Sequence, residues 1–235
     1  MENIFDYIRW RGDLNLRQSP FNAVDSLILC RLSYFPLGGL VPGKGQSAIL
    51  LREAYRRFAD KQGDPEWKKN HPLLQKEDPA LFAAMAASER FGSMRLSNFV
   101  NSLDYTEGKQ FAAVTITMDE GVASLGGNET VYVAYRGTDN TLLGWKEDFE
   151  IAFRTVPAQQ EAVEYLDYVA GHFTGPIRVG GHSKGGNLAV FAASFCKMCI
   201  RDRGIALQRF DYYQTFFENV FRAKEDADAE EPTAE

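Results

Sequence analysis

The sequence predicts an α/β fold: a mostly parallel sheet with flanking helices, preceded by a helical region over about residues 1–100. Two observations favour this class. Apolar residues in the first hundred positions recur at helical spacing, and the chain beyond them alternates strand-like and helix-like runs. Strand, helix, strand and helix in that order is typical of parallel strands joined by helices.

Two stretches of the N-terminal region follow a helical pattern, over 47–60 and 79–88. A further apolar group at 27–29 follows Asp25 and Ser26, which we interpret as a helix cap. We expect all three to form helices.

Strand and helix signals then alternate along the second half of the chain. Runs rich in β-branched residues predict strands over 111–118 and 130–135, which we expect to pair. An apolar stripe predicts a helix from about Pro157, followed by a short strand at 177–179. The segment 185–195 is almost wholly apolar and is therefore predicted to be a buried helix.

Composition and charge limit the possible classes of protein. The 235 residues suffice for one large domain, and 45% hydrophobic with 25% charged residues is typical of a globular chain. The net charge of -6 argues against nucleic acid as the main partner, because phosphate binding needs a basic face. We find no signal peptide, no apolar run long enough for a transmembrane segment and no disulfide framework spacing, so we expect a cytoplasmic protein.

The segment that points to chemistry joins the strand at 177–179 to the helix at 185–195. There Gly181, Ser183 and Gly185 form a G-x-S-x-G pattern, in the strand-to-helix context that a serine nucleophile requires. The two glycines avoid clashes where the chain doubles back, which would present the Ser183 hydroxyl at the C-terminal edge of the sheet. A glycine-rich turn that merely opens a helix is the alternative.

Two backbone N–H groups are candidates for an oxyanion hole. Lys184 would supply the first, at the N-terminus of the helix, where the dipole favours negative charge. The second normally comes from the loop after an earlier strand, which makes Thr138 the candidate, although an ordinary strand-ending turn would look the same. We expect His182 to pack or bond locally, and His71 and His172 to be structural.

Three blocks of sequence, at 135–139, 145–149 and 181–189, resemble the signature blocks of lipase-type α/β hydrolases related to class 3 lipases. We call the strand-to-helix turn at 181–186 the elbow. Together with further matches near the start of the chain, the elbow more closely resembles the bacterial Mbeg-like family over about residues 3–196. The resemblance implies an α/β-hydrolase fold with Ser183 as nucleophile and Thr138 as oxyanion donor. It also implies that Trp145 and Asp148 support the oxyanion loop.

The sequence therefore predicts a serine hydrolase, esterase-like or lipase-like, that acts through an acyl-enzyme on Ser183. We expect a small-molecule ester as substrate, with lipid-like esters among the candidates, and no cofactor or metal. One alternative is a catalytically inactive scaffold that binds a ligand or a partner protein. A zinc or redox protein using Cys196 and Cys199 is a remoter alternative, because no second ligand pair accompanies them.

The chain after residue 196 departs from this pattern. Triads on this fold follow the order Ser, acid, His, yet no histidine follows Ser183. Residues 197–203 resemble the translation of a transposon-end adapter used in sequencing libraries, although a natural protein could carry this heptapeptide. We expect 1–196 to be an incomplete hydrolase domain, 197–203 to be an artefact, and 204–235 to be a tail of doubtful origin with an acidic, disordered end.

We predict that the chain as written hydrolyses esters poorly or not at all, because removing the base of a serine triad lowers turnover by up to roughly a millionfold. The measurement compares ester turnover of residues 1–235 with that of a version completed from the source genome. Equal turnover by the two proteins, both soluble and monomeric, would contradict the truncation and the adapter interpretation together.

Overall fold

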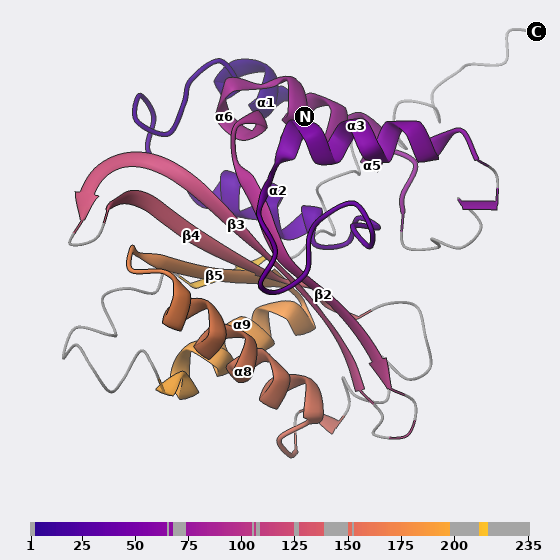
Figure 1. Cartoon of the computed structure of the whole chain (residues 1–235), viewed down its shortest axis with the longest axis vertical. Coiled ribbons are helices and arrows are strands. Elements are labelled where there is room, and N and C mark those ends of the chain that lie inside the picture. The colour runs from indigo at the N-terminus through magenta and orange to yellow at the C-terminus, as the bar shows by residue number, and fades with distance from the viewer. Residues whose placement is uncertain are drawn as a thin grey trace, which may run out of the picture.

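One twisted sheet lies between two layers of helices in this computed structural model (Figure 1). The structure describes residues 3–64, 66–67, 74–104, 106, 109–124, 127–138, 150–151, 153–197 and 212–215. Over these residues the six strands lie in the spatial order β1-β2-β3-β4-β5-β6. They are β1 (Ile49–Leu50), β2 (Arg95–Asp104), β3 (Lys109–Ser124), β4 (Gly127–Tyr135), β5 (Ile177–His182) and β6 (Tyr212–Thr215).

The sheet is mixed, so the predicted mostly parallel sheet of an α/β-hydrolase fold is wrong. β1 to β4 pair antiparallel in turn, whereas β4 with β5 and β5 with β6 pair in parallel. Short connections join β2 to β3 and β3 to β4, and such connections suit antiparallel neighbours, whereas parallel neighbours need a long crossover. The expected pairing of the strands at 111–118 and 130–135 is confirmed in β3 and β4.

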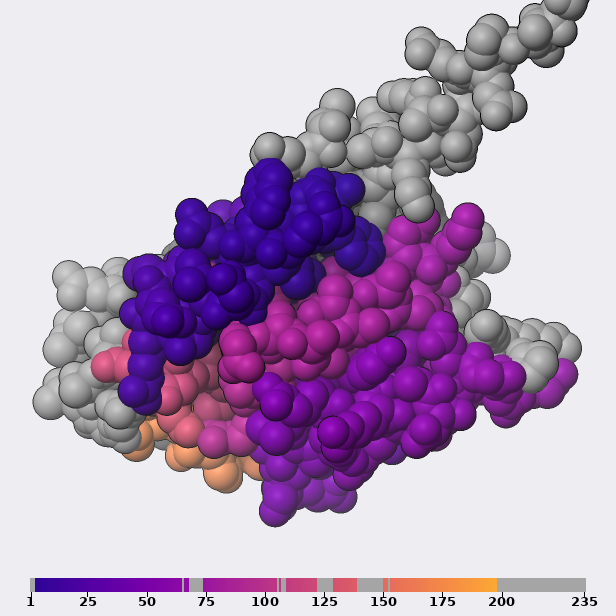
Figure 2. Space-filling model, turned by 90° about the horizontal axis from the view of Figure 1, so that it is seen from above, coloured from indigo at the N-terminus to yellow at the C-terminus, as the bar shows by residue number. Residues whose placement is uncertain are grey.

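The two layers of helices come from different parts of the chain. The N-terminal layer covers one face of the sheet, and the segments coloured indigo to magenta form most of the surface seen from above (Figure 2). No helix of the described residues combines the length and apolar character needed to cross a bilayer. The N-terminal layer contains α1 (Ile4–Arg11), α2 (Ala23–Leu32), α3 (Leu51–Gln62), α5 (Asp78–Ala87) and α6 (Glu89–Gly92), and the opposite face carries α8 (Pro157–His172) and α9 (Lys184–Phe195).

The expected helices are confirmed in α2, α3, α5, α8 and α9, and the starting points of α2 and α3 differ from the predicted ones by more than one residue. α3 begins at Leu51 because the two residues before it pair with β2 as β1. α2 begins before the expected cap: Asn22 accepts hydrogen bonds from the N–H groups of Val24 and Asp25, and the Asp25 carboxylate accepts one from the Asn22 N–H. Asp25 is therefore the third residue of the helix, where it closes a capping box with Asn22, rather than the cap itself.

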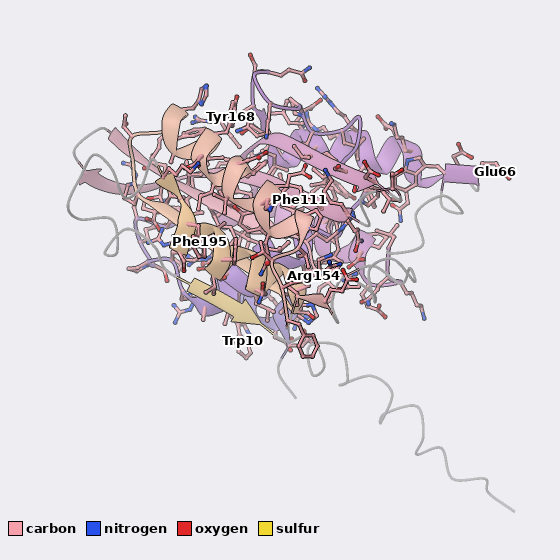
Figure 3. All side chains as sticks on the ribbon, turned by 90° about the horizontal axis from the view of Figure 1, so that it is seen from below. Trp10, Glu66, Phe111, Arg154, Tyr168 and Phe195 are labelled. Atoms are coloured by element: carbon pink, nitrogen blue, oxygen red, sulfur yellow. The ribbon has the colours of Figure 1, made fainter. Side chains whose placement is uncertain are left out.

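Alternate side chains of the central strands fill two separate cores, because successive strand residues point to opposite faces. Toward the N-terminal layer, β3 and β4 contribute Val114, Ile116, Met118, Tyr132 and Ala134. Toward α8 and α9 they contribute Phe111, Ala113, Val131, Val133 and Tyr135. The view from below shows Phe111 under α8, which carries Tyr168 (Figure 3).

β2 has no counterpart among the predicted strands. A register shift between Ser97 and Val100 interrupts its pairing with β3, and Asn98 there has a φ of 53°. Such a bulge breaks the regular alternation by which strands are recognised. The Tyr165 hydroxyl of α8 donates a hydrogen bond to the Asn98 carbonyl at 2.8 Å and so ties the bulge to the opposite layer.

The tail beyond residue 196 is described only in part. β6 comes from this tail and pairs in parallel with β5, a strand we did not expect there. Of the segment 197–203 the structure describes Lys197 alone. The adapter origin of that segment therefore stays a prediction.

A buried ion pair between Arg90 of α6 and Asp25 of α2 holds the N-terminal layer together. The two guanidinium-to-carboxylate hydrogen bonds measure 2.6 and 2.5 Å, and both side chains are fully buried. The remaining guanidinium donors bind the backbone carbonyls of Leu14, Ser19 and Pro20. One arginine thus connects two helices to the loop that precedes α2.

We predict that Arg90→Met lowers the free energy of unfolding by about 3–5 kcal/mol, because it leaves the Asp25 carboxylate buried without its charged partner. Urea denaturation measures the change. Arg17→Met is the matched control, since the ion pair of Arg17 with Asp119 is exposed and screened by solvent. The control should unfold nearly as wild type does, and equal losses in the two variants would contradict the assignment.

Candidate active site

Ser183 lies on a strained turn between β5 and α9. Its backbone has a φ of 55° and a ψ of -123°, a conformation that residues other than glycine rarely adopt. Such a conformation costs about 1–3 kcal/mol and persists only where the surrounding structure imposes it. The residue is partly exposed, as a nucleophile that meets a substrate must be.

The expected elbow glycines, Gly181 and Gly185, lie against the end of β4. A Cβ atom at Gly181 would lie 2.3 Å from the Gly185 carbonyl carbon and 2.7 Å from the Tyr135 oxygen. At Gly185 it would lie 2.3 Å from the same Tyr135 oxygen. Real Cβ atoms do not approach backbone atoms this closely, so both positions require glycine.

A third glycine, Gly137, completes this contact and was not singled out in the sequence. A Cβ atom there would lie 2.4 Å from the Tyr34 hydroxyl and 2.5 Å from the His182 carbonyl oxygen. The loop after β4 is thereby packed directly on the elbow. The sequence did contain a signal for Gly137, because this residue immediately precedes Thr138, where a loop that supplies an oxyanion donor must approach the elbow closely.

The two expected oxyanion donors belong to these neighbouring backbone segments. Lys184 is the first residue of α9, and Thr138 follows Gly137 in the loop that packs on the elbow. The structure therefore places Lys184 directly after Ser183 in the turn, and it brings Gly137, the neighbour of Thr138, against the His182 carbonyl. Trp145 and Asp148, the expected supports of the oxyanion loop, lie outside the described residues.

The Lys184 side chain is buried rather than solvated. Its Nζ donates a hydrogen bond to the Gln110 carbonyl of β3 at 3.1 Å. The ammonium group is therefore bound within the protein, and the part of Lys184 that faces the turn is its backbone at the helix N-terminus.

His182 is hydrogen-bonded to a residue far along the chain rather than to a sequence neighbour. Its Nδ1 lies 3.2 Å from the Tyr34 hydroxyl. Burial lowers its pKa to about 4, with a smaller contribution from the positive charge of Arg31, so the imidazole is neutral at physiological pH. Within the described ranges, no side chain is hydrogen-bonded to the Ser183 hydroxyl.

The other histidines are placed differently. His172 ends α8, where its Nδ1 lies 2.7 Å from the Tyr168 carbonyl, in keeping with a structural role. His71 lies outside the described residues.

The cysteines that suggested a zinc or redox site are described in part. Cys196 is buried directly after α9. Cys199 lies outside the described residues. Cys30 is a buried cysteine whose sulfur lies 3.1 Å from the Tyr132 hydroxyl in the N-terminal core.

A family model described as Mbeg1-like matches residues 85–231. The matched span contains β2 to β6, both helices of the opposite layer and the Ser183 turn. It begins after most of the N-terminal layer. Neither the curated proteins nor the solved structures contain a match to the chain.

We predict that Gly137→Ala lowers the free energy of unfolding by about 1–3 kcal/mol, the usual cost of forcing an atom into a packed site. Chemical denaturation measures it. Gly63→Ala is the control, because the space around Gly63 at the end of α3 is open and its φ is -71°. An alanine there should be neutral or slightly stabilising. If Gly137→Ala were equally harmless, the packing of the loop on the elbow would be refuted.

We also predict a contribution of His182 to the pH dependence of stability. Because its pKa in the folded protein is about 4, below the unfolded value near 6.5, the unfolded chain binds more protons between these values. Stability from this group is therefore present above about pH 6.5 and lost as the pH falls toward 4. The melting temperature of His182→Asn should fall less over this range than that of wild type.

An identical fall in the wild type and His182→Asn would show that His182 is free to take up a proton in the folded protein.

Proposed function

The chain belongs to the Mbeg1-like family, and from this premise we propose that it is a serine hydrolase that cleaves an ester through an acyl-enzyme on Ser183. The observation that carries the proposal is the φ of 55° at Ser183. A turn with only a structural task would place glycine there at no conformational cost. That a serine stands in this strained position favours a functional role for its hydroxyl.

The surroundings of Ser183 suit the steps of this reaction. The hydroxyl oxygen attacks the ester carbonyl carbon, and the N–H groups of Lys184 and Thr138 bind the resulting oxyanion. The carbon–oxygen bond to the leaving alcohol then breaks, and that alcohol receives the proton that a base took from Ser183. Water attacks the acyl-enzyme in the same manner, releasing the acid and restoring the serine.

His182 does not act as this base in the proposal. Its Nδ1 is engaged with the Tyr34 hydroxyl, and a pKa of about 4 makes the imidazole a poor proton acceptor. The Lys184 ammonium is buried against the Gln110 carbonyl, so it does not replace a histidine either. The side chains of His182 and Lys184 thus hold the backbone on either side of Ser183 in place and do not transfer protons.

The resemblance to class 3 lipases supports an ester, with lipid-like esters among the candidates, as the substrate. It also supports Trp145 and Asp148 as residues that brace the oxyanion loop. The chemistry uses only the serine, a base and backbone donors, so the proposal involves no metal or cofactor. A catalytically inactive binding protein is the competing outcome of the test.

We predict that the protein expressed from its source gene reacts with a fluorophosphonate at Ser183, detected as a single mass increase of the intact protein. Ser183→Ala should remain folded and unlabelled. Ser194→Ala is the matched control, because Ser194 is an exposed serine near the end of α9, the helix that Ser183 precedes. Its hydroxyl donates a hydrogen bond to the Val190 carbonyl. It should label as wild type does.

Two results would contradict the proposal. Labelling that persists in Ser183→Ala would place the reactive group elsewhere. A folded wild-type protein that takes up no probe would favour the inactive binding protein.

A further inference from the structure

Tyr34 connects the N-terminal layer to both segments of the candidate site. It follows α2, where its N–H donates to the Arg31 carbonyl at 3.0 Å, and its side chain is 8% exposed. It lies outside the residues that the family model matches, which begin at 85. Its hydroxyl nevertheless reaches the loop after β4 and the last residue of β5.

The hydroxyl of Tyr34 makes two hydrogen bonds. The Gly137 N–H donates to the hydroxyl oxygen at 3.1 Å, and the hydroxyl lies 3.2 Å from His182 Nδ1. Burial raises the pKa of Tyr34 to about 12, so the phenol keeps its proton at physiological pH. The hydroxyl oxygen is therefore a neutral acceptor for the Gly137 N–H.

The Tyr34 ring is itself held in place from the N-terminal layer. The Arg31 guanidinium carbon lies 5.2 Å from the ring centre, a cation–π distance. Two hydrogen bonds of 2.8 and 2.5 Å fix that guanidinium to the buried Asp78 carboxylate of α5. A phenol with so little freedom can restrain the groups that bind it.

The loop after β4 needs such a restraint. Gly137 must lack a side chain to fit between the Tyr34 hydroxyl and the His182 carbonyl, and glycine is the residue with the greatest backbone freedom. The next N–H along the chain is that of Thr138, the proposed oxyanion donor. An unrestrained Gly137 would let this donor turn away from the oxyanion.

We propose that Tyr34 is a positioning residue, which fixes the Gly137 backbone to the elbow and thereby aims the Thr138 N–H at the oxyanion formed on Ser183. The inference rests on the proposed function and adds a residue from a distant part of the chain to it. Complete loss of an oxyanion donor costs about 100- to 1000-fold in rate. Loosening a donor that is still present should cost about 10- to 100-fold.

The test compares Tyr34→Phe with Tyr165→Phe in the protein expressed from its source gene. Tyr165 is a matched control, because it is a buried tyrosine whose hydroxyl bonds with Thr115 and the Asn98 carbonyl and not with Gly137 or His182. The phenylalanine keeps the ring that contacts Tyr135. Both variants should lose comparable stability. In Tyr34→Phe alone, the maximal rate of fluorophosphonate reaction at Ser183 should fall about 10- to 100-fold, with the probe concentration at half-maximal rate unchanged.

A second measurement does not depend on reactivity. Amide hydrogen exchange at Gly137 should be at least about tenfold faster in Tyr34→Phe and unchanged in Tyr165→Phe, because only the first loses the acceptor of that N–H. Unchanged exchange at Gly137, or an unchanged maximal rate in a protein that labels, would overturn the inference. If wild type does not label, the proposed function fails, and faster exchange would then show Tyr34 to be a structural clamp without a role in catalysis.

Discussion

The structure around Ser183 depends on one contact, in which the backbone of the elbow lies against the backbone at the end of β4. Tyr135 pairs with Gly181 in the parallel register of β4 and β5, and its carbonyl oxygen leaves no room for a side chain at Gly181 or Gly185. This contact directs the chain sharply from β5 into α9. The strained conformation of Ser183 lies in this turn, and such strain persists only where the surrounding structure imposes it.

This constraint explains how a mixed sheet can carry a site first inferred for a parallel one. The site needs two adjacent strands whose C-terminal ends meet at one edge, and β4 and β5 satisfy that requirement. β1 to β3 continue the sheet in the antiparallel sense and separate the two cores. The N-terminal layer does more than cover a face, because it supplies Tyr34, whose hydroxyl binds Gly137.

Local patterns in the sequence were sufficient to locate the turn and the elements on either side of it. The run after Ser183 is long and almost wholly apolar, so α9 was predicted within one residue of its observed bounds. β5 was predicted only as 177–179, and it extends to His182. The sheet type was wrong because pairing direction depends on connections and partners that no single segment encodes. β2 in particular is masked by its bulge at Asn98, and without it the antiparallel half was not visible.

The hydrogen bonds of the Tyr34 hydroxyl with Gly137 and His182 could not have been predicted from local patterns. Tyr34 and His182 are separated by 148 positions, and neither the spacing nor the neighbours of this tyrosine distinguish it from others in the chain. Its role follows from three-dimensional packing, in which the buried pair of Arg31 and Asp78 holds the ring. Gly137 could have been identified from the sequence more easily than Tyr34, since it precedes Thr138, the residue already expected to bind the oxyanion.

A crystal structure of the phosphonate adduct would test the central claim most directly, because its phosphoryl oxygen stands in for the oxyanion. The account predicts a bond from phosphorus to Ser183 Oγ, with that oxygen about 2.7–3.1 Å from the backbone nitrogens of both Lys184 and Thr138. An adduct on another residue, or a phosphoryl oxygen turned away from these two nitrogens, would contradict it.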